Sequence, residues 1–393
     1  MVSQRQLFLQ HQAQTTDFPL MLEIEKAEGV FMYGPQGQPY LDLISGIGVS
    51  NVGHRHPAVL RAIEAQLEKY LHLMVYGEVI QTPQVQLAVA LRDTLPSGLC
   101  CTYFVSSGSE AVEGALKLAK RYTGRTELIS AHNAYHGSTH GPLSLNGNEN
   151  FKRAFRPLLP DVRHIHYNNL EDLEMISNRT AAVILETVQG EAGVRLPQNN
   201  YLQRVRERCD QTGTLLILDE IQTGFGRTGK FWGFAHFGIV PDILVCAKGM
   251  GGGMPIGAFI SSAEVMAVLK SDPMLGHITT FGGHPVSCAA SLATLRVITE
   301  GNLLAEVDRK AQLFRELLVH PQIREVRSCG LLMAADFVSF EKLKPVIDRA
   351  ITLGVLTDWF LFCDNSMRIA PPLTITEEEI RLACRLILQA LKK

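Results

Sequence analysis

A lysine and an aspartate each follow a short apolar run, in positions that suit the chemistry of amines. Asp219 comes directly after Leu215–Leu218, and Lys248 ends the run DILVCAK ahead of Gly249 and Gly251–Gly253. A lysine that is partly removed from water has a lowered amine pKa and attacks carbonyl carbons. The glycines remove side-chain bulk where a flat cofactor would approach the backbone. We therefore expect Lys248 to be a nucleophile and Asp219 to face a cationic ring nitrogen.

Small polar residues stand between an apolar run and an amphipathic segment at Ser106-Ser107-Gly108-Ser109. If a helix begins here, its first backbone N–H groups and the positive end of its dipole face whatever lies in front, which suits a phosphate group. Serine and glycine are also ordinary capping residues, so this segment taken alone is equally consistent with a capped helix.

Two glutamates lie close to the end of another apolar run, AAVILE. Glu186 ends that run, and Glu191 is flanked by Gly190 and Gly193. With Asp219 and Lys248, the chain offers a phosphate seat, an acid for a ring nitrogen and an amine that can form a Schiff base. This is the set of groups that pyridoxal 5′-phosphate (PLP) requires of a protein.

The elements that must position these residues alternate along the middle of the chain. Apolar runs predict strands at 102–105, 127–131, 181–186, 215–218, 243–247 and 257–261, and amphipathic segments predict helices at 110–122, 200–211 and 286–299. Strands that are apolar on both faces indicate a mostly parallel sheet covered by helices. In such folds ligands bind at the carboxyl ends of the strands, where the polar residues above are found.

The pattern predicts an α/β fold with two domains. Residues 46–300 are expected to form the large domain with the mostly parallel central sheet. The N-terminal segment 1–45, with an antiparallel hairpin over 22–44, and the C-terminal segment 301–393 are expected to form a smaller α+β domain. The last predicted helix, 376–392, opens with Thr376 and Glu379, which have the spacing of a capping box.

The composition limits the classes of partner. The 393 residues carry 37 basic and 39 acidic side chains, a net charge of −2 without a basic run, so we expect no nucleic-acid partner. The segment Met1–Gln14 lacks the apolar region of an export signal, and no apolar stretch reaches membrane-spanning length, so we expect no membrane partner. Eight cysteines without a C-x-x-C spacing favour a reducing cytoplasm. The expected partner is a small molecule.

The motifs resemble those of the class III aminotransferases of fold type I, the group that contains acetylornithine, ornithine and 4-aminobutyrate aminotransferases. The similarity covers nearly the whole chain, with motifs at 41–57, 106–122, 134–139, 185–194, 218–229, 247–258, 279–285 and 367–376. It implies a PLP-dependent transferase fold and a homodimer whose active sites are shared between subunits.

The resemblance also implies roles for individual residues. Lys248 would bind the cofactor as a Schiff base and then move the proton between substrate and cofactor, and Asp219 would keep the pyridine nitrogen protonated. Tyr135 would stack on the ring and Gln222 would face its phenolic oxygen. The implied cofactor-binding residues are Ser107, Gly108, Ser109, Tyr135, His136, Glu186, Asp219, Gln222, Lys248 and, from the partner subunit, Thr280.

The substrate is predicted from positions where the chain departs from the family. Related enzymes commonly carry a carboxylate-binding arginine where this chain has Ser138, and a serine cannot replace a bidentate guanidinium–carboxylate pair. Ornithine enzymes tend to have a tyrosine where Ile47 stands. The expected reaction is amino transfer from an ornithine-like or other ω-amino donor to 2-oxoglutarate, giving a semialdehyde and glutamate. A 4-aminobutyrate or a diamine, putrescine-type donor stays open, the latter because residues 155–167 are similar to putrescine-type enzymes.

Glu191 and Arg368 occupy positions that pair in the related enzymes. The hypothesis is that Glu191 neutralises Arg368 while the ω-amino donor reacts and then moves away, so that Arg368 binds the carboxylate of 2-oxoglutarate. The alternative is a permanent salt bridge between the two domains.

Two other kinds of site are weighed. Gly224 to Lys230 matches the first part of a P-loop, but Phe231 stands where a magnesium-binding hydroxyl belongs. A P-loop nucleotide-binding protein is therefore a remote alternative. The pairs His54/His56 and His164/His166 lack neighbours that would complete a metal site, so no metal is expected.

Overall fold

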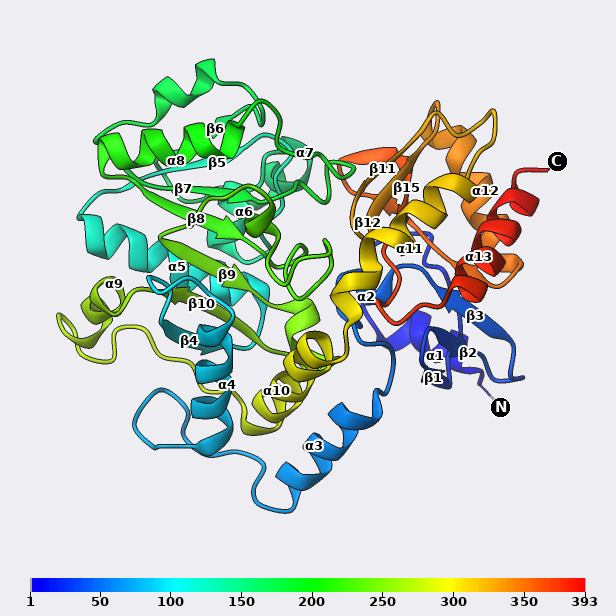
Figure 1. The fold of residues 1–393 in the computed structure, drawn as a ribbon, viewed down its shortest axis with the longest axis horizontal. Coiled ribbons are helices and arrows are strands. Elements are labelled where there is room, and N and C mark those ends of the chain that lie inside the picture. The colour runs from blue at the N-terminus through cyan, green and yellow to red at the C-terminus, as the bar shows by residue number, and fades with distance from the viewer. Residues whose placement is uncertain (1, 393) are drawn as a thin grey trace.

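The computed structural model describes residues 2–392; Met1 and Lys393, the outermost residues of the predicted domains, lie outside the described part. The chain forms two lobes, with α10 and α11 running between them (Figure 1). The larger lobe is built on a seven-stranded sheet. Its strands are β4 (Cys101–Val105), β5 (Glu127–Ala131), β6 (Val162–Ile165), β7 (Thr180–Glu186), β8 (Leu215–Asp219), β9 (Ile243–Cys246) and β10 (Gly257–Ser261).

The strand order is β4-β10-β9-β8-β7-β5-β6, and every neighbouring pair from β9 to β6 is parallel, whereas β10 runs antiparallel to both β9 and β4. Alternate residues of β7 enter different cores: Val183 and Leu185 pack on one face, and Ala182 and Ile184 on the other. Burial on both faces is the reason these strands read as continuous apolar runs. The mostly parallel sheet predicted from the sequence is confirmed.

Helices cover both faces of this sheet. α5 contacts β9 and β10, and α10 packs against α3 and α4. The longer helices of this lobe are α3 (Pro57–Leu67), α4 (Thr82–Asp93), α5 (Gly108–Thr123), α8 (Tyr201–Thr212) and α10 (Pro285–Glu300). The short ones are α2 (Ser45–Gly48), α6 (His140–Leu145), α7 (Glu149–Lys152) and α9 (Ala263–Ala267).

The smaller lobe combines both ends of the chain. Leu41 and Leu43 share one core with Phe314 and Ile380, and β3 pairs in parallel with β13. Its strands are β1 (Lys26–Glu28), β2 (Phe31–Tyr33), β3 (Pro39–Asp42), β11 (Glu325–Cys329), β12 (Leu332–Asp336), β13 (Val355–Leu356), β14 (Trp359–Phe360) and β15 (Cys363–Ile369). Its helices are α1 (Gln4–His11), α11 (Leu303–Leu317), α12 (Phe340–Thr352) and α13 (Glu377–Ala390). We propose the domain boundaries 1–45, 46–300 and 301–393 on this basis.

Most of the predicted elements are present. β5 and β10 have the predicted bounds, and Thr376 and Glu379 form the predicted capping box of α13. The helices α3 and α4 and the strand β6 are not predicted from the sequence. The spacing of Ala111, Ala115, Leu118, Ala119 and Tyr122 predicts one apolar stripe on α5. For Tyr122 this prediction is wrong, because its side chain is exposed and its hydroxyl donates to Glu264 Oε1 at 2.7 Å. None of the helices in residues 2–392 combines the length and the apolar character needed to cross a bilayer.

Candidate active site

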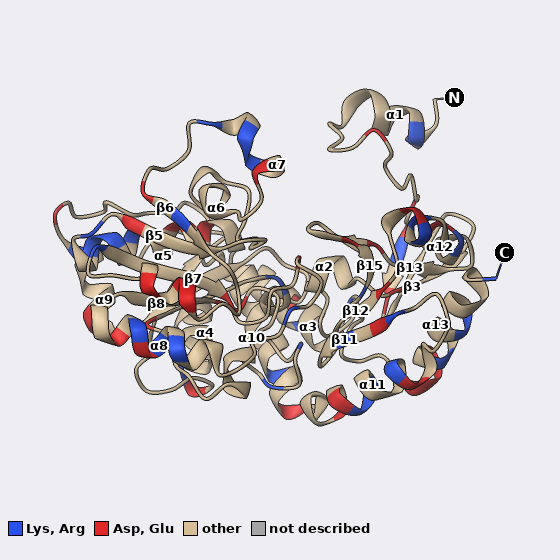
Figure 2. Cartoon of the chain, turned by 90° about the horizontal axis from the view of Figure 1, so that it is seen from above, with Lys and Arg blue, Asp and Glu red and all other residues tan. Residues whose placement is uncertain are grey.

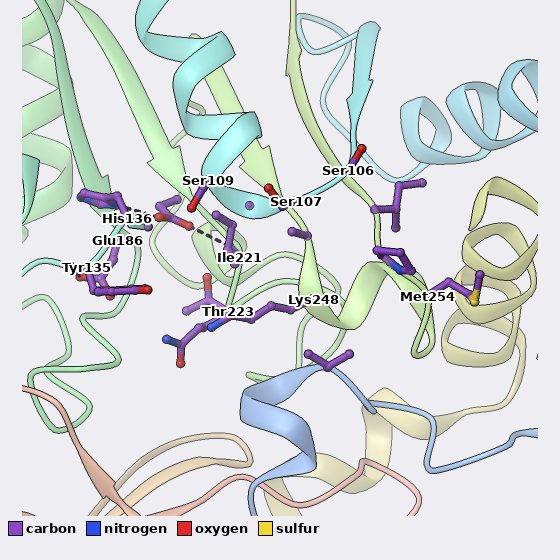
Figure 3. A pocket seen from close by; sticks show the side chains of 18 of the residues that line it. Ser106, Ser107, Ser109, Tyr135, His136, Glu186, Ile221, Thr223, Lys248 and Met254 are labelled. Atoms are coloured by element: carbon purple, nitrogen blue, oxygen red, sulfur yellow. Dashed lines mark hydrogen bonds and ion pairs between the residues drawn. The ribbon is translucent and has the colours of Figure 1, made fainter. Parts of the chain in front are cut away.

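A cavity of about 390 Å³ opens at the carboxyl ends of the parallel strands, close to the junction with the smaller lobe (Figure 3). This volume lies in the usual range for small-molecule sites. The predicted residues that line it are Ser107, Gly108, Ser109, Tyr135, His136, Glu186, Asp219, Gln222 and Lys248. Residues separated by up to 141 positions in the chain therefore meet at one edge of the sheet, from Ser107 to Lys248.

Lys248 follows β9 and points into the cavity (Figure 3). Its backbone has φ of +47°, a left-handed conformation that side chains other than glycine seldom adopt, so local packing holds the residue in place. Burial lowers the pKa of its ammonium group, and the charge of Glu191 opposes this shift. Its amine is therefore less basic than that of a surface lysine, as a carbonyl-reactive nucleophile requires.

Asp219 ends β8 and is held by two donors. Its Oδ2 lies 2.7 Å from Nδ1 of His136, and its Oδ1 accepts the backbone N–H of Ile221 at 2.9 Å. Both side chains of the Asp219–His136 pair are buried. The imidazole thus fixes the orientation of the carboxylate, in the way that second-shell partners orient functional groups elsewhere.

The N-terminus of α5 faces the cavity (Figure 3). Ser107 is its N-cap, and Ser107 Oγ accepts the N–H of Glu110 at 3.2 Å. The N–H groups of Gly108 and Ser109 belong to the first turn, so no carbonyl of the helix can accept from them. Ser109 Oγ packs against Gly137, whose φ is +132°, and a Cβ at Gly137 would collide with that oxygen. The geometry is that of an anion-binding site.

Glu186 lies at the end of β7, deeper in the cavity wall. It accepts the backbone N–H of Gly190 at 3.1 Å and that of Tyr135 at 3.4 Å. Burial and the neighbouring charge of Asp219 raise the pKa of this carboxyl well above its usual range, although the bond from Gly190 opposes the shift. Glu186 therefore fixes the backbone of Tyr135 at the cavity wall.

Glu191 and Arg368 form a buried bidentate ion pair beside the cavity. Nη1 and Nη2 of Arg368 lie 2.9 and 3.0 Å from the two carboxylate oxygens of Glu191. Burial raises the pKa of Glu191, but the guanidinium outweighs this effect and brings it to about 2. Gln222, which lines the cavity, donates to Glu191 Oε1 at 3.0 Å. The pair is thus one hydrogen bond away from the cavity surface.

Besides Glu191 and Arg368, three predicted residues are not among those that line the cavity. Ser138 is exposed at its rim, where its Oγ lies 3.1 Å from the hydroxyl of Tyr135. Ile47 is exposed in α2 with φ of +65°. Thr280 is exposed in the segment that precedes α10. Other lining residues were not predicted: Val49, Gly137, Val188, Ile221, Thr223, Ala247 and Met254–Ile256. Proximity to Asp219 and Lys248 was the only sequence signal for several of these.

The two rejected kinds of site find no support in residues 2–392. The segment after Lys230 forms bends and a short 3-10 helix at Gly233–His236, whereas a P-loop must open an α-helix. Across the described chain no group of three or more His, Cys, Asp or Glu side chains is arranged to hold a metal ion.

A family model described as aminotransferase class-III matches residues 12–391. The chain belongs to this family. Among solved structures it is similar to the ornithine aminotransferase of Toxoplasma gondii ME49, with 30% identity, a TM-score of 0.91 and coverage of 98% of this chain and 93% of that one. It is also similar to an amine transaminase from an uncultivated Pseudomonas species, with 29% identity, a TM-score of 0.88 and coverage of 96% and 99%. A third similar structure is a thermostable omega transaminase mutant from Pseudomonas jessenii, with 26% identity, a TM-score of 0.92 and coverage of 99% of this chain and 98% of that one.

The protein is therefore a PLP-dependent transaminase of fold type I. Its cavity fits this cofactor, because a helix N-terminus with free N–H groups, a buried carboxylate held by His136 and a buried lysine surround one space. When bound, PLP supplies an aldehyde that condenses with amines and a pyridinium ring that accepts electrons. The chain contributes binding, orientation and proton transfer. The residues suited to these tasks are those at the ends of β7, β8 and β9 and at the start of α5.

Proposed function

We propose that this class-III aminotransferase transfers an amino group from an ornithine-like or other ω-amino donor to 2-oxoglutarate, giving a semialdehyde and glutamate. The observation that carries the proposal is the buried Glu191–Arg368 pair, which lies one hydrogen bond from the cavity through Gln222. The ornithine aminotransferase and the omega transaminases among the similar structures agree with it.

The Glu191–Arg368 pair would allow one site to bind two unlike substrates in turn. An ω-amino donor brings an amine without an adjacent carboxylate, whereas glutamate and 2-oxoglutarate carry a carboxylate beside the reacting carbon. A permanently free arginine would favour the second kind and select against the first. With Glu191 in place Arg368 is neutralised, and when Glu191 moves away the guanidinium can bind a carboxylate through two parallel hydrogen bonds.

The donor end of the site is defined by Ser138. The rim of the cavity carries the Tyr135–Ser138 hydroxyl pair instead of an arginine, and among the described lining residues Lys248 is the only cation. A donor with a carboxylate at its far end would find no bidentate partner there. This observation favours a diamine as the second candidate donor, and it counts against the far-end carboxylates of 4-aminobutyrate and ornithine alike.

We further propose the roles that the family resemblance implies. Lys248 carries the proton between substrate and cofactor, and Asp219 keeps the pyridine nitrogen protonated. Tyr135 stacks on the ring, Gln222 faces the phenolic oxygen, and the first turn of α5 binds the phosphate. Each role requires the side chain at the cavity wall, which is where Tyr135, Gln222 and the start of α5 lie.

A homodimer in a reducing cytoplasm completes the proposal. Thr280 and the large apolar side chain of Phe281 are exposed on the segment before α10, where they are available to a second copy of the chain. All eight cysteines fall in the described residues and none forms a disulfide, which supports a reducing compartment.

The test measures the two half-reactions separately by stopped flow in the Glu191→Ala and Arg368→Ala variants. If Glu191 acts as a gate, Glu191→Ala slows the reaction of the ω-amino donor and leaves that of glutamate as fast as in the wild type or faster. Arg368→Ala should cost the 2-oxoglutarate reaction about 2–5 kcal/mol, because one partner of a buried charged pair is removed. Equal losses in both half-reactions would establish a permanent salt bridge instead.

A further inference from the structure

Arg368 has a second carboxylate partner, Asp358, on the strand segment that faces it. β14 and β15 run antiparallel with Trp359 opposite Met367, so Asp358 and Arg368 lie across from each other. The backbone N–H of Arg368 donates to the carbonyl of Asp358 at 2.9 Å. The side chains meet as well, because Nε of Arg368 donates to Oδ1 of Asp358 at 2.8 Å.

The two carboxylates bind different edges of the guanidinium. Glu191 takes Nη1 and Nη2, whereas Asp358 takes Nε. The neighbours of Asp358 hold the same group: the carbonyl of Trp359 accepts from Nη2 at 3.3 Å, and the guanidinium carbon lies 4.5 Å from the centre of the Phe360 ring. The contacts from residues 358–360 leave the Nη1–Nη2 edge to Glu191, so they can persist when Glu191 is absent.

We propose that Asp358 is a positioning residue that keeps Arg368 aimed at the active site while the Nη1–Nη2 edge exchanges Glu191 for the carboxylate of the acceptor. The inference rests on the proposed function, because it needs Arg368 to bind 2-oxoglutarate. A long arginine side chain that loses its only partner gains rotamer freedom. With Asp358 on Nε, that freedom stays restricted throughout the cycle.

The charges of Arg368, Glu191 and Asp358 support the same assignment of roles to the two carboxylates. Arg368 is enclosed by two carboxylates, and its side chain is only 3% exposed. Asp358 supplies a permanent counter-charge, so Arg368 is not left as an unpaired buried cation when Glu191 moves. Replacement of the Glu191 carboxylate by a substrate carboxylate then leaves the charge around the guanidinium unchanged. The exchange therefore needs no new buried charge.

The experiment compares Asp358→Ala and Asp358→Asn in the holoenzyme with Asp364→Ala, which removes an exposed acid from the next strand, β15. The probe is glutarate, a dicarboxylate without a reactive carbonyl, whose dissociation constant is measured by calorimetry. Asp358→Ala should raise this constant and the KM for 2-oxoglutarate about 10–100-fold, the effect of losing a hydrogen bond to a charged group. Its kcat and the half-reaction of the ω-amino donor should change by less than about threefold.

Asp358→Asn tests whether the side-chain hydrogen bond to Arg368, and not only the backbone pairing of β14 with β15, positions the guanidinium. Its amide oxygen can still accept from Nε but carries no charge, so recovery of most of the glutarate affinity in this variant assigns the effect to positioning rather than to the counter-charge. Asp364→Ala should bind glutarate as the wild type does. The inference is overturned if Asp358→Ala leaves glutarate affinity unchanged, or if it slows both half-reactions alike in step with a lower melting temperature. A wild-type enzyme that neither binds glutarate nor reacts with 2-oxoglutarate would refute the proposed function instead.

Discussion

We propose that two residues at the ends of neighbouring strands carry the covalent and electronic tasks of the site. Lys248 follows β9 and Asp219 ends β8, and because these strands pair in parallel, both side chains reach the same cavity. The surrounding chain treats them differently. Lys248 is made less basic by burial, whereas Asp219 is fixed by His136 and the N–H of Ile221.

For Lys248, we expect the holoenzyme to retain its cofactor covalently after reduction with borohydride. Only an amine in this cavity can reach the cofactor aldehyde, and exposed lysines such as Lys26 cannot compete, because they lie outside it. Peptide mass spectrometry should find the reduced adduct on Lys248. An adduct on another lysine would remove Lys248 from its role.

For Asp219→Asn, we expect PLP to bind while turnover falls about 100-fold or more, because an uncharged partner no longer stabilises the cationic ring nitrogen. The measurement is kcat together with the dissociation constant of the cofactor. His136→Asn is the companion variant, since it removes the residue that orients Asp219 and should produce a smaller loss. Near-normal turnover in Asp219→Asn would contradict the assignment.

We propose that Ser138 determines which amino donor the enzyme prefers. In a single-turnover screen of ornithine, acetylornithine, 4-aminobutyrate, putrescine and β-alanine, we expect the best donor to be one that needs no arginine at position 138. Ser138→Arg should raise kcat/KM for 4-aminobutyrate, because a guanidinium then pairs with its carboxylate. A wild-type enzyme that already reacts fastest with 4-aminobutyrate would argue against this interpretation.

At the scale of elements, we propose that the N-terminus of α5 serves both helix stability and cofactor binding. Its N-cap Ser107 accepts a backbone N–H at 3.2 Å, and the N-cap of α13, Thr376, accepts one at 3.3 Å. Both caps accept the N–H of the third helical residue, but only the cap of α13 also forms the reciprocal capping-box bond, and only that of α5 lines the cavity. Substitutions of Ser107 and Thr376 therefore separate the effect of a cap on cofactor binding from its effect on helix stability.

Ser107→Ala and Thr376→Ala should each lower the free energy of unfolding by about 1 kcal/mol, the usual contribution of an N-cap. Only Ser107→Ala should also weaken PLP binding, because the first turn of α5 faces the cofactor site. Chemical denaturation of the apoprotein gives the first quantity, and fluorescence titration with PLP gives the second. If both variants bound PLP as the wild type does, α5 would not be the phosphate site.

At the scale of the molecule, the surface offers apolar side chains that a second copy would cover. Ile80 and Phe18 are 93% and 87% exposed, and α1 projects beyond the smaller lobe with no buried residue (Figure 2). Large exposed apolar side chains of this kind mark interaction surfaces when they are grouped. Thr280 does not line the cavity of its own chain. In the proposed homodimer it would instead contribute to the cavity of the partner subunit.

We expect light scattering to give about twice the mass of the 43.4 kDa chain. Mixed dimers then test the sharing of sites. Lys248→Ala and Thr280→Ala subunits should each bind cofactor poorly alone, whereas a mixture should recover part of the wild-type activity, because one hybrid site combines intact Lys248 with an intact partner threonine. A mixture that recovers nothing would place Thr280 outside the partner's site.

Sequence periodicity determined much of this protein by itself. Buried strands read as apolar runs, caps read as Ser and Thr three residues ahead of a glutamate, and polar residues at strand ends indicated the cofactor chemistry, since all these signals are local. Only the tertiary structure shows where the side chains of two adjacent carboxylates lie. Asp219 faces the cavity, whereas its neighbour Glu220 is buried against the N–H groups of Gly233 and Phe234.

The partners of Arg368 also follow from the tertiary structure. Its pair with Glu191 spans 177 positions, and only the family resemblance suggested it. Its bond to Asp358 depends on the register between β15 and the two-residue strand β14, which the sequence pattern does not resolve. Contacts of this kind follow from how lobes and strands pack, and neither residue type nor spacing encodes that packing locally.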